Sequence, residues 1–546
     1  MEWGALAGIV AVYCAVVLGH SDVVPMWDAR IYYDQCLVPA VTDGFHLGQL
    51  NCFKHPSAAY MTLVALPQMI LPGNVFLVHM VNMVLGVLGL LAFHGAVRSL
   101  FTDRRGKWER LAMVSCLAFS PLYISSSLNI NPDFGVITFG LITLALALSR
   151  VFRAVPIAGM FMVFSKEFGI VLYGVGIAIY AIVFVTRNQG SVRGKVLFLL
   201  RRSWIAIPVF VFLVHLLVAL FTSDQAAVWS PSPGTGKDQA MKGMLDAFTG
   251  FSLLDPVFLN YCRGILVLNF NWLYALPVAA FILFKLVCWL FAIEWPTRDL
   301  SEDGSQRKRL FTLAMFFVSF LLLTRYRTYS NVRYFLPLLP LLLLSYGWVL
   351  GDFVSSRIIR LAIIGFAAVG ALLSNIQMID PVTKAAYGTW KFGNHDMLWV
   401  TDLTGECCGY GRDQLQYNLE FTKFHDALNV VFKEIQLDEN TRLVGHADED
   451  WYLLGRVDKA TRERTLSFDN VFEPELIPVA AIYTKKVEPP KEMYYLALPN
   501  FRHEERLRFL STLYEIEWAK AVGTSGYMID VYKMRLKGTQ AKKEMP

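Results

Sequence analysis

The sequence predicts a polytopic α-helical membrane protein with a small soluble α/β domain after its last span. Three observations lead to this fold class: 55% of the 546 residues are hydrophobic, only 17% are charged, and the mean hydropathy is +0.43. Soluble domains usually carry about 25% charged residues, so a chain of this length is not one soluble domain. The net charge of +6 is not gathered in a nucleic-acid-like patch, and the 8 cysteines lack zinc-site spacing.

Apolar runs that are long enough, or nearly long enough, to cross a membrane recur through residues 1–380. A helix of about 20 apolar residues spans the hydrocarbon core, and we count about 11 such runs. The first lacks the basic region and cleavage pattern of a signal peptide, so it is interpreted as a retained span. The runs lie at 3–20, 75–97, 111–128, 135–149, 154–165, 167–186, 203–222, 266–292, 310–324, 336–351 and 361–379.

The basic residues predict the orientation of these spans. Loops after alternate spans are rich in Arg and Lys, at 98–110, 150–153, 187–202, 298–309 and 357–360. Because Lys and Arg concentrate on the cytoplasmic side, these loops and the N-terminus are expected in the cytoplasm. The outer face is then expected to hold 21–74, 129–134, 223–265, 325–335 and everything after about 380.

The last part of the chain, 381–546, is charged and mixed in character. Helical periodicity is found at 415–435, and 501–510 also looks helical. Short buried strands are expected at 442–446, 476–483 and 492–498, with a closing hairpin formed by 514–518 and 527–532. The chain therefore divides into a transmembrane domain, 1–380, and an extracytoplasmic α/β domain, 381–546.

Polar chemistry concentrates in the predicted outer loops. The first, 21–74, is long, and loops of that length are usually functional. The loop 223–265 contains the run SPSPGTGKD, whose composition predicts a mobile lid. Several different short motifs lie in these loops and at the outer ends of predicted helices. They are Trp27-Asp28, Tyr32-Tyr33, Lys54-His55-Pro56, Asn131-Pro132-Asp133, Ser165-Lys166-Glu167 and Arg333-Tyr334-Phe335-Leu336-Pro337.

In their order and common outward placement, these motifs resemble the GT-C superfamily of membrane glycosyltransferases. Within it, the chain is similar to the protein O-mannosyltransferase and aminoarabinose-transferase-like group, and its tail resembles the soluble domain of many members. The resemblance implies a hexosyl- or pentosyltransferase that takes a sugar from a polyprenyl-phosphate donor and inverts the anomeric centre. It also implies that an acidic residue of the first outer loop, by position Asp28, is the base.

The chemistry of the residue types agrees with this implication. A carboxylate can take the proton of an attacking hydroxyl, and Asp34 is the rival candidate to Asp28. A phosphate leaving group needs cations where negative charge grows, and arginine forks suit phosphate oxygens. The residues expected to bind substrate are Arg30, Tyr33, Asp34, Lys54, His55, Lys166, Glu167, Arg325, Arg327, Arg333 and Tyr334.

Each assignment has a competing interpretation. Asp28 could cap a helix, Lys54 and His55 could be interfacial residues, and the three loop arginines could anchor helices to headgroups. Lys166 and Glu167 could form a mutual ion pair that holds a helix break, and Asn131-Pro132-Asp133 could be a plain Asx-Pro turn. At the level of function, the alternatives are a flippase for a lipid-linked glycan and a non-catalytic envelope assembly protein.

The cofactor requirement and the cellular location are predicted from short sequence motifs that the chain lacks and from its cysteines. The first loop lacks a clear DxD motif, so the reaction is expected to need no metal or other cofactor besides the lipid-linked donor. The chain has no N-x-[ST] sequon, which favours a bacterial inner membrane with the active site facing the periplasm. Cys36 and Cys52 share the first loop, where a disulfide is expected in an oxidising compartment. Cys407-Cys408 has no physical account, and the sugar and the glycan, lipid or protein acceptor are not encoded in any motif.

Overall fold

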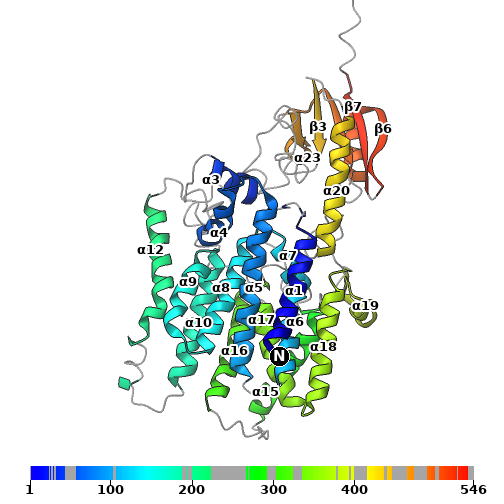
Figure 1. The fold of residues 1–546 in the computed structure, drawn as a ribbon. Coiled ribbons are helices and arrows are strands. Elements are labelled where there is room, and N and C mark those ends of the chain that lie inside the picture. The colour runs from blue at the N-terminus through cyan, green and yellow to red at the C-terminus, as the bar shows by residue number, and fades with distance from the viewer. Residues whose placement is uncertain are drawn as a thin grey trace, which may run out of the picture.

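The computed structural model is mostly helical, with a small sheet at one end of a helical bundle (Figure 1). Short pieces at 23, 25, 29, 193–194 and 266–267 are described in addition to the main segments. The main described segments are 2–21, 32–42, 57–101, 106–186, 200–222, 270–291, 303–323, 335–376, 379–392, 395–398, 415–435, 440–445, 464–472, 488–497, 503–525 and 527–538.

Each predicted apolar run overlaps at least one of the described helices. By length and composition, three described helices could each cross a membrane, or four if one pair bent by 117° counts as a single span. Several other apolar helices are shorter, so the predicted count of about 11 spans is not confirmed. The helices are α1 (Glu2–Gly19), α5 (Val75–Leu100), α6 (Lys107–Ala118), α7 (Pro121–Ser127), α8 (Pro132–Leu148), α9 (Val155–Val163), α10 (Glu167–Thr186), α12 (Ile207–Thr222), α15 (Asn271–Leu290), α16 (Asp303–Leu323), α17 (Leu338–Phe353) and α18 (Arg357–Leu373).

The apolar run at 111–128 is not one helix, contrary to the prediction. It is divided between α6 and α7 by Ser120, whose backbone is extended at φ −62° and ψ 129°. Proline disfavours the helical conformation in the residue before it, and Pro121 itself fits the first turn of the next helix. The same X-Pro step recurs at Asn131-Pro132, where α8 begins. Pro121 and Pro132 thus mark two turns of the chain, one where α7 begins and one where α8 begins.

Ion pairs gather the Arg-rich segments at one end of the bundle. Arg110 at the start of α6 binds Glu2 at the start of α1, with an Nη2–Oε2 distance of 2.9 Å. At the start of α18, Arg360 binds Glu109 through Nε and Oε2 at 3.1 Å. The N-terminus lies at this Arg-rich end, whereas α3 (Val38–Thr42), α4 (Ala58–Gln68) and the sheet lie at the opposite end (Figure 1). The sharing of one end by these Arg-containing segments agrees with the predicted alternation of spans.

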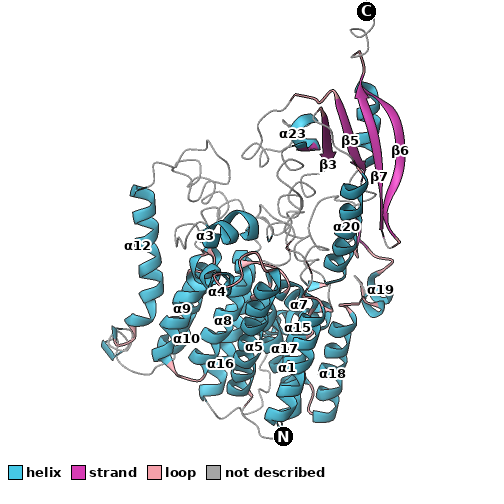
Figure 2. Cartoon of the chain, turned by 45° about the horizontal axis from the view of Figure 1, so that its top comes forward, coloured by secondary structure: helices cyan, strands magenta, loops and turns pink. Residues whose placement is uncertain are grey.

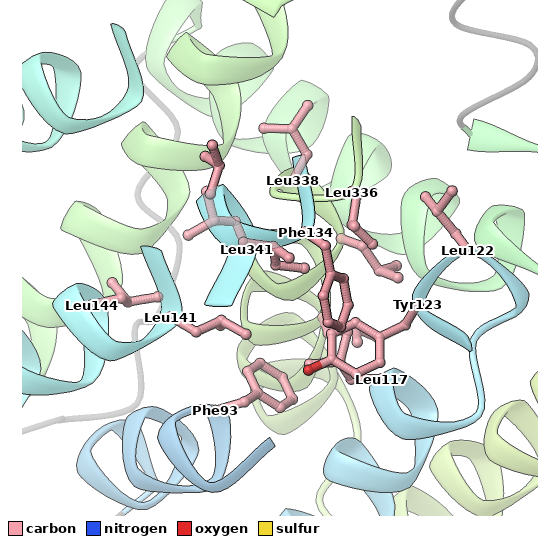
Figure 3. Packing of buried hydrophobic residues seen from close by; sticks show 14 of the residues in the cluster. Phe93, Leu117, Leu122, Tyr123, Phe134, Leu141, Leu144, Leu336, Leu338 and Leu341 are labelled. Carbon is pink, nitrogen blue, oxygen red and sulfur yellow. The ribbon is translucent and has the colours of Figure 1, made fainter. Parts of the chain in front are cut away.

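Aromatic and leucine side chains from several helices fill the core of the bundle (Figure 3). Tyr123 of α7 packs against Phe134 of α8, with ring centroids 5.5 Å apart, and its hydroxyl donates to the Gly86 carbonyl at 2.7 Å. A Cβ at Gly89 would lie 2.5 Å from the Tyr123 hydroxyl oxygen. Glycine on α5 therefore admits the tyrosine and ties α7 to α5.

A five-stranded sheet forms the C-terminal part, in the order β4-β3-β5-β7-β6 (Figure 2). β3 is parallel to β4 and β5, while β7 is antiparallel to β5 and β6. The predicted strand at 476–483 lies outside the described residues, and the domain boundary near 380 stays a prediction. The elements are β1 (Lys391–Phe392), β2 (His395–Asp396), β3 (Thr441–Gly445), β4 (Thr465–Ser467), β5 (Glu492–Ala497), β6 (Tyr514–Thr524) and β7 (Tyr527–Leu536), with α19 (Pro381–Tyr387), α20 (Leu415–Glu434), α23 (Phe468–Phe472) and α24 (His503–Leu513).

Candidate active site

A buried ion pair joins two of the predicted motifs. Lys166 Nζ donates to Asp133 Oδ2 at 2.9 Å, and the two side chains are only 2% and 1% exposed. Asp133 lies in the first turn of α8, and Lys166 lies between the end of α9 and the start of α10. Removing two charges from water is costly unless they are paired closely. The pair therefore holds the two helix starts in a defined relation.

The residues just before Asp133 explain why its side chain lies in the first turn of α8. Asn131 is the N-cap of α8, and its side-chain oxygen accepts from the Asp133 N–H at 3.2 Å, while Pro132 occupies the first helical position. An acidic residue in the first turn also complements the positive end of the helix dipole. The Asx-Pro turn considered for Asn131-Pro132-Asp133 is present, but it is not a plain turn, because Asp133 also pairs with Lys166.

Glycines bring the Lys166 segment close to α8. A Cβ at Gly135 would lie 2.7 Å from Ser165 Oγ and 3.0 Å from Tyr60 Cβ, so a larger residue would push α8 away from both. A Cβ at Gly169 would lie 2.3 Å from the Met162 carbonyl oxygen. The absence of a side chain at Gly135 lets α8 approach α4 and Ser165, and its absence at Gly169 lets the start of α10 lie against the end of α9.

A second polar network connects described parts of the segment 21–74 to α5. Tyr60 in α4 donates its hydroxyl to Asn82 Oδ1 at 2.9 Å, and the Asn131 N–H donates to the Tyr60 hydroxyl at 3.2 Å. Asn82 Nδ2 donates to the Asn129 carbonyl at 2.9 Å. One turn earlier on α5, His79 Nδ1 donates to the Ser21 carbonyl at 2.8 Å, where the loop begins. Both the start and the later part of the loop are thus anchored to the first two turns of one helix.

Sequence reasoning missed Tyr60, His79 and Asn82 as members of the site. A signal for two of them was present, because His79 and Asn82 interrupt the apolar run at 75–97. Polar residues inside such runs usually face the protein interior and find a partner there. Both side chains are 0% exposed, as this rule predicts.

Four of the predicted site residues belong to described segments: Tyr33, Asp34, Lys166 and Glu167. Tyr33 is buried in a π-helical segment, Tyr32–Leu37, with its hydroxyl 3.9 Å from the position of a Cβ on Gly73; Asp34 belongs to the same segment. Lys166 and Glu167 are both buried beside α8 and α10. The remaining predicted site residues lie outside the described residues: Asp28, Arg30, Lys54, His55, Arg325, Arg327, Arg333 and Tyr334.

The directions of several helices place partial positive charge at the end of the bundle that carries the Asp133–Lys166 pair. Lys308 at the start of α16 donates to the Ser99 carbonyl near the end of α5, at 3.0 Å, so α16 starts at the Arg-rich end. Arg309 lies 3.5 Å from Asp352 near the end of α17, so α17 begins at the end that carries the Asp133–Lys166 pair. α5, α8, α10 and α17 therefore all direct their N-termini to this end, and each N-terminus carries about half a positive charge.

A metal-independent reaction and a disulfide between Cys36 and Cys52 were also predicted. Within the part of the chain that the structure describes, no group of three or more His, Cys, Asp and Glu side chains could hold a metal ion. Metal independence therefore stays a prediction. Cys36 is disulfide-bonded, whereas Cys14, Cys116 and Cys288 are free. The bonding partner lies outside the described residues, so the pairing of Cys36 with Cys52 also stays a prediction.

Comparisons with known proteins bear on the fold. No family model matches the chain, and no curated protein matches it. Among solved structures, the chain is similar to ArnT from Cupriavidus metallidurans bound to undecaprenyl phosphate, at 15% identity and a TM-score of 0.53, over 97% of this chain and 98% of that chain. The apo form of ArnT matches over the same shares of the two chains at 15% identity, with a TM-score of 0.49.

The oligosaccharyltransferase of Archaeoglobus fulgidus matches at 12% identity and a TM-score of 0.44, over 90% of this chain and 69% of that chain. The likeness to lipid-bound ArnT shows a shared fold, and the predicted resemblance to aminoarabinose transferases is confirmed for the fold. The described helices include three that are apolar and long enough to span a bilayer. The chain is therefore an integral membrane protein with the fold of ArnT and a small C-terminal sheet.

Proposed function

We propose that the chain is an integral membrane glycosyltransferase that transfers a sugar from a polyprenyl-phosphate donor to an acceptor hydroxyl. The observation that carries the proposal is the polar end of the bundle, where the Asp133–Lys166 pair and the Tyr60–Asn82 network hold the first outer loop. Support for the donor class comes from the fold shared with ArnT, which was solved with undecaprenyl phosphate bound.

The proposed reaction is a single inverting displacement. The acceptor oxygen attacks the anomeric carbon, the bond from that carbon to the phosphate oxygen breaks on the opposite face, and polyprenyl phosphate leaves. The Asp28 carboxylate takes the proton of the attacking hydroxyl, with Asp34 as the rival base. No metal takes part in this scheme.

The leaving phosphate gains negative charge, and cations must stabilise it. The four helix N-termini supply a positive potential at this end of the bundle. Lys166 and Glu167 are proposed to contact the donor from the start of α10. The other proposed phosphate ligands come from the first loop and from the loop between α16 and α17: Arg30, Lys54, His55, Arg325, Arg327 and Arg333.

The setting that suits this reaction is the periplasmic face of a bacterial inner membrane. The disulfide at Cys36 supports an oxidising compartment for the first loop. A glycan, a lipid or a protein could each present the acceptor hydroxyl, and the transferred sugar is a hexose or a pentose.

The test compares cells that express the chain with cells that lack it. Mass spectrometry of the envelope glycans is expected to show one sugar residue that depends on the chain, and membranes are expected to release polyprenyl phosphate from the matching donor. Unchanged glycans, together with movement of intact labelled lipid across liposomes, would instead identify a flippase.

A further inference from the structure

A short segment with exposed apolar and basic side chains follows α18. The helix α18 starts at the Arg-rich end of the bundle, where Arg360 binds Glu109 at 3.1 Å, so it ends at the opposite end. The next elements in the chain are α19 and β1, and α19 lies beside α18 (Figure 1). We call residues 379–392 the juxtamembrane segment, because they directly follow this helix of the membrane-embedded bundle.

Exposed apolar side chains form a stripe along the second half of α18 and just beyond it: Phe366, Val369, Leu373 and Ile376. Their spacing of three or four residues places them on one face of the helix. In an integral membrane protein, such a face is suited to the hydrocarbon core of the bilayer. The lipid-facing surface of the bundle therefore extends to the start of the juxtamembrane segment.

Two hydrogen bonds hold the juxtamembrane segment against the bundle. Asp380 is the N-cap of α19, and its carboxylate accepts from the Thr383 N–H at 2.7 Å. The Thr383 hydroxyl oxygen accepts from the indole N–H of Trp272 at 2.9 Å, and Trp272 lies in the first turn of α15. Asp380 and Thr383 are both buried. The segment is thus held at the level of the bundle where α15 begins and α18 ends.

A series of aromatic rings leads from this attachment to the protein surface. The ring centroids of Trp272 and Tyr387 are 5.7 Å apart, and those of Tyr387 and Trp390 are 5.5 Å apart. Trp390 is 58% exposed, whereas tryptophan is on average a highly buried residue. Val382 on α19 and Lys391, which follows Trp390, are also exposed. The segment therefore presents a large aromatic ring, an aliphatic side chain and a lysine to its surroundings.

We propose that the juxtamembrane segment binds the headgroup region of the bilayer, with Trp390 at the boundary between headgroups and acyl chains. Tryptophan favours this level because its ring is apolar and its indole N–H can donate to water or to lipid oxygens. Lys391 can extend its ammonium group to a lipid phosphate. The stripe on α18 continues to this segment, which favours lipid over a protein partner. This anchor is separate from the proposed donor site and does not depend on sugar transfer.

The test uses the full chain in vesicles of phosphatidylcholine and phosphatidylglycerol whose acyl chains carry bromine, which quenches tryptophan fluorescence on contact. One set of vesicles carries bromine near the carbonyl end of the chains, and another carries it near the methyl end. The emission of Trp390 is the difference between the parent chain and Trp390→Phe, which keeps an aromatic ring beside Tyr387. Most of this emission is expected to be lost with bromine near the carbonyl end and to be retained with bromine near the methyl end.

Trp518→Phe is the matched control. Trp518 is 39% exposed, and it lies on β6 of the sheet rather than in the juxtamembrane segment. The emission of Trp518 is expected to be the same in brominated and unbrominated vesicles. Iodide, which stays in the water, is expected to quench Trp518 strongly and Trp390 weakly. Melting temperatures in detergent are expected to be equal for the two variants and the parent chain, which checks that the fold is retained.

Three outcomes would overturn the proposal. Emission of Trp390 that iodide quenches and bromine does not would mean that the segment faces water. Emission of Trp390 that neither quencher reduces would mean that protein covers it, either a second copy of the chain or another partner. Equal quenching of Trp390 and Trp518 by bromine would mean that lipid contact is not specific to the juxtamembrane segment.

Discussion

Lys166 and Asp133 are 33 residues apart in the chain and form an ion pair of 2.9 Å that is almost wholly buried. Sequence reasoning treated each charge with its immediate neighbours, Lys166 with Glu167 and Asp133 with Asn131. The fold instead connects the first turn of α8 to the start of α10. This connection places a buried ion pair at the end of the bundle where Tyr60 of α4 is tied to α5 through Asn82.

Removing one partner of this pair should destabilise the protein more than removing both. Lys166→Met leaves Asp133 as a buried, uncompensated charge, with an expected loss of about 3–5 kcal/mol. The double variant Lys166→Met/Asp133→Leu replaces both charges by apolar groups and should melt closer to the parent chain. Melting temperatures in detergent check this, with Lys384→Met on the exposed surface of α19 as control. A double variant that is no more stable than the single one would contradict the role assigned to the pair.

The Tyr60 hydroxyl should matter for stability because it both donates and accepts. Tyr60→Phe leaves Asn82 Oδ1 and the Asn131 N–H without this partner in a buried place, at an expected cost of about 1–3 kcal/mol. Tyr346→Phe is the matched control: the Tyr346 hydroxyl is also buried, and it has no hydrogen-bond partner among the described residues. Its removal should be neutral or slightly stabilising. Similar melting temperatures for the two variants would argue against the network.

Asp28→Asn should abolish most of the sugar transfer, because an amide cannot take the acceptor proton. The expected fall in rate is about 10²–10⁴-fold, with expression and donor binding retained. Asp34→Asn is the comparison, since Asp34 lies in the neighbouring π-helical segment. Initial rates of polyprenyl phosphate release from the donor measure both variants. If Asp34→Asn is the inactive one, the base has been assigned to the wrong carboxylate.

Chelation should leave the activity intact if no metal assists the leaving group. Membranes treated with EDTA are expected to transfer sugar at the untreated rate, because arginine, lysine and helix N-termini take the place of a cation in the proposed scheme. The control adds Mg²⁺ or Mn²⁺ after EDTA. Activity that disappears with EDTA and returns with either ion would require a metal in the mechanism.

Much of the fold was predictable because its signals are local. Apolar runs of sufficient length predict the helices, the short apolar run at 492–498 predicts β5, and the residues on both sides of Gly523 predict the hairpin that β6 and β7 form. Short elements were missed: β4 has three residues and α23 has five, too few for a period to be seen. The break at Ser120-Pro121 was also missed, although Pro121, the first residue of α7, indicates it.

The sequence by itself determined a membrane-embedded helical chain, the end at which its basic segments gather, and the later sheet, because hydrophobic period and charge act over neighbouring residues. Only the tertiary structure decided that Lys166 meets Asp133, that Tyr60 meets Asn82, and that Gly135 lies close to Ser165 and Tyr60. The physical reason is that a buried polar group takes whichever partner the packing of distant helices brings within hydrogen-bond reach. That partner is a property of helix packing rather than of sequence spacing.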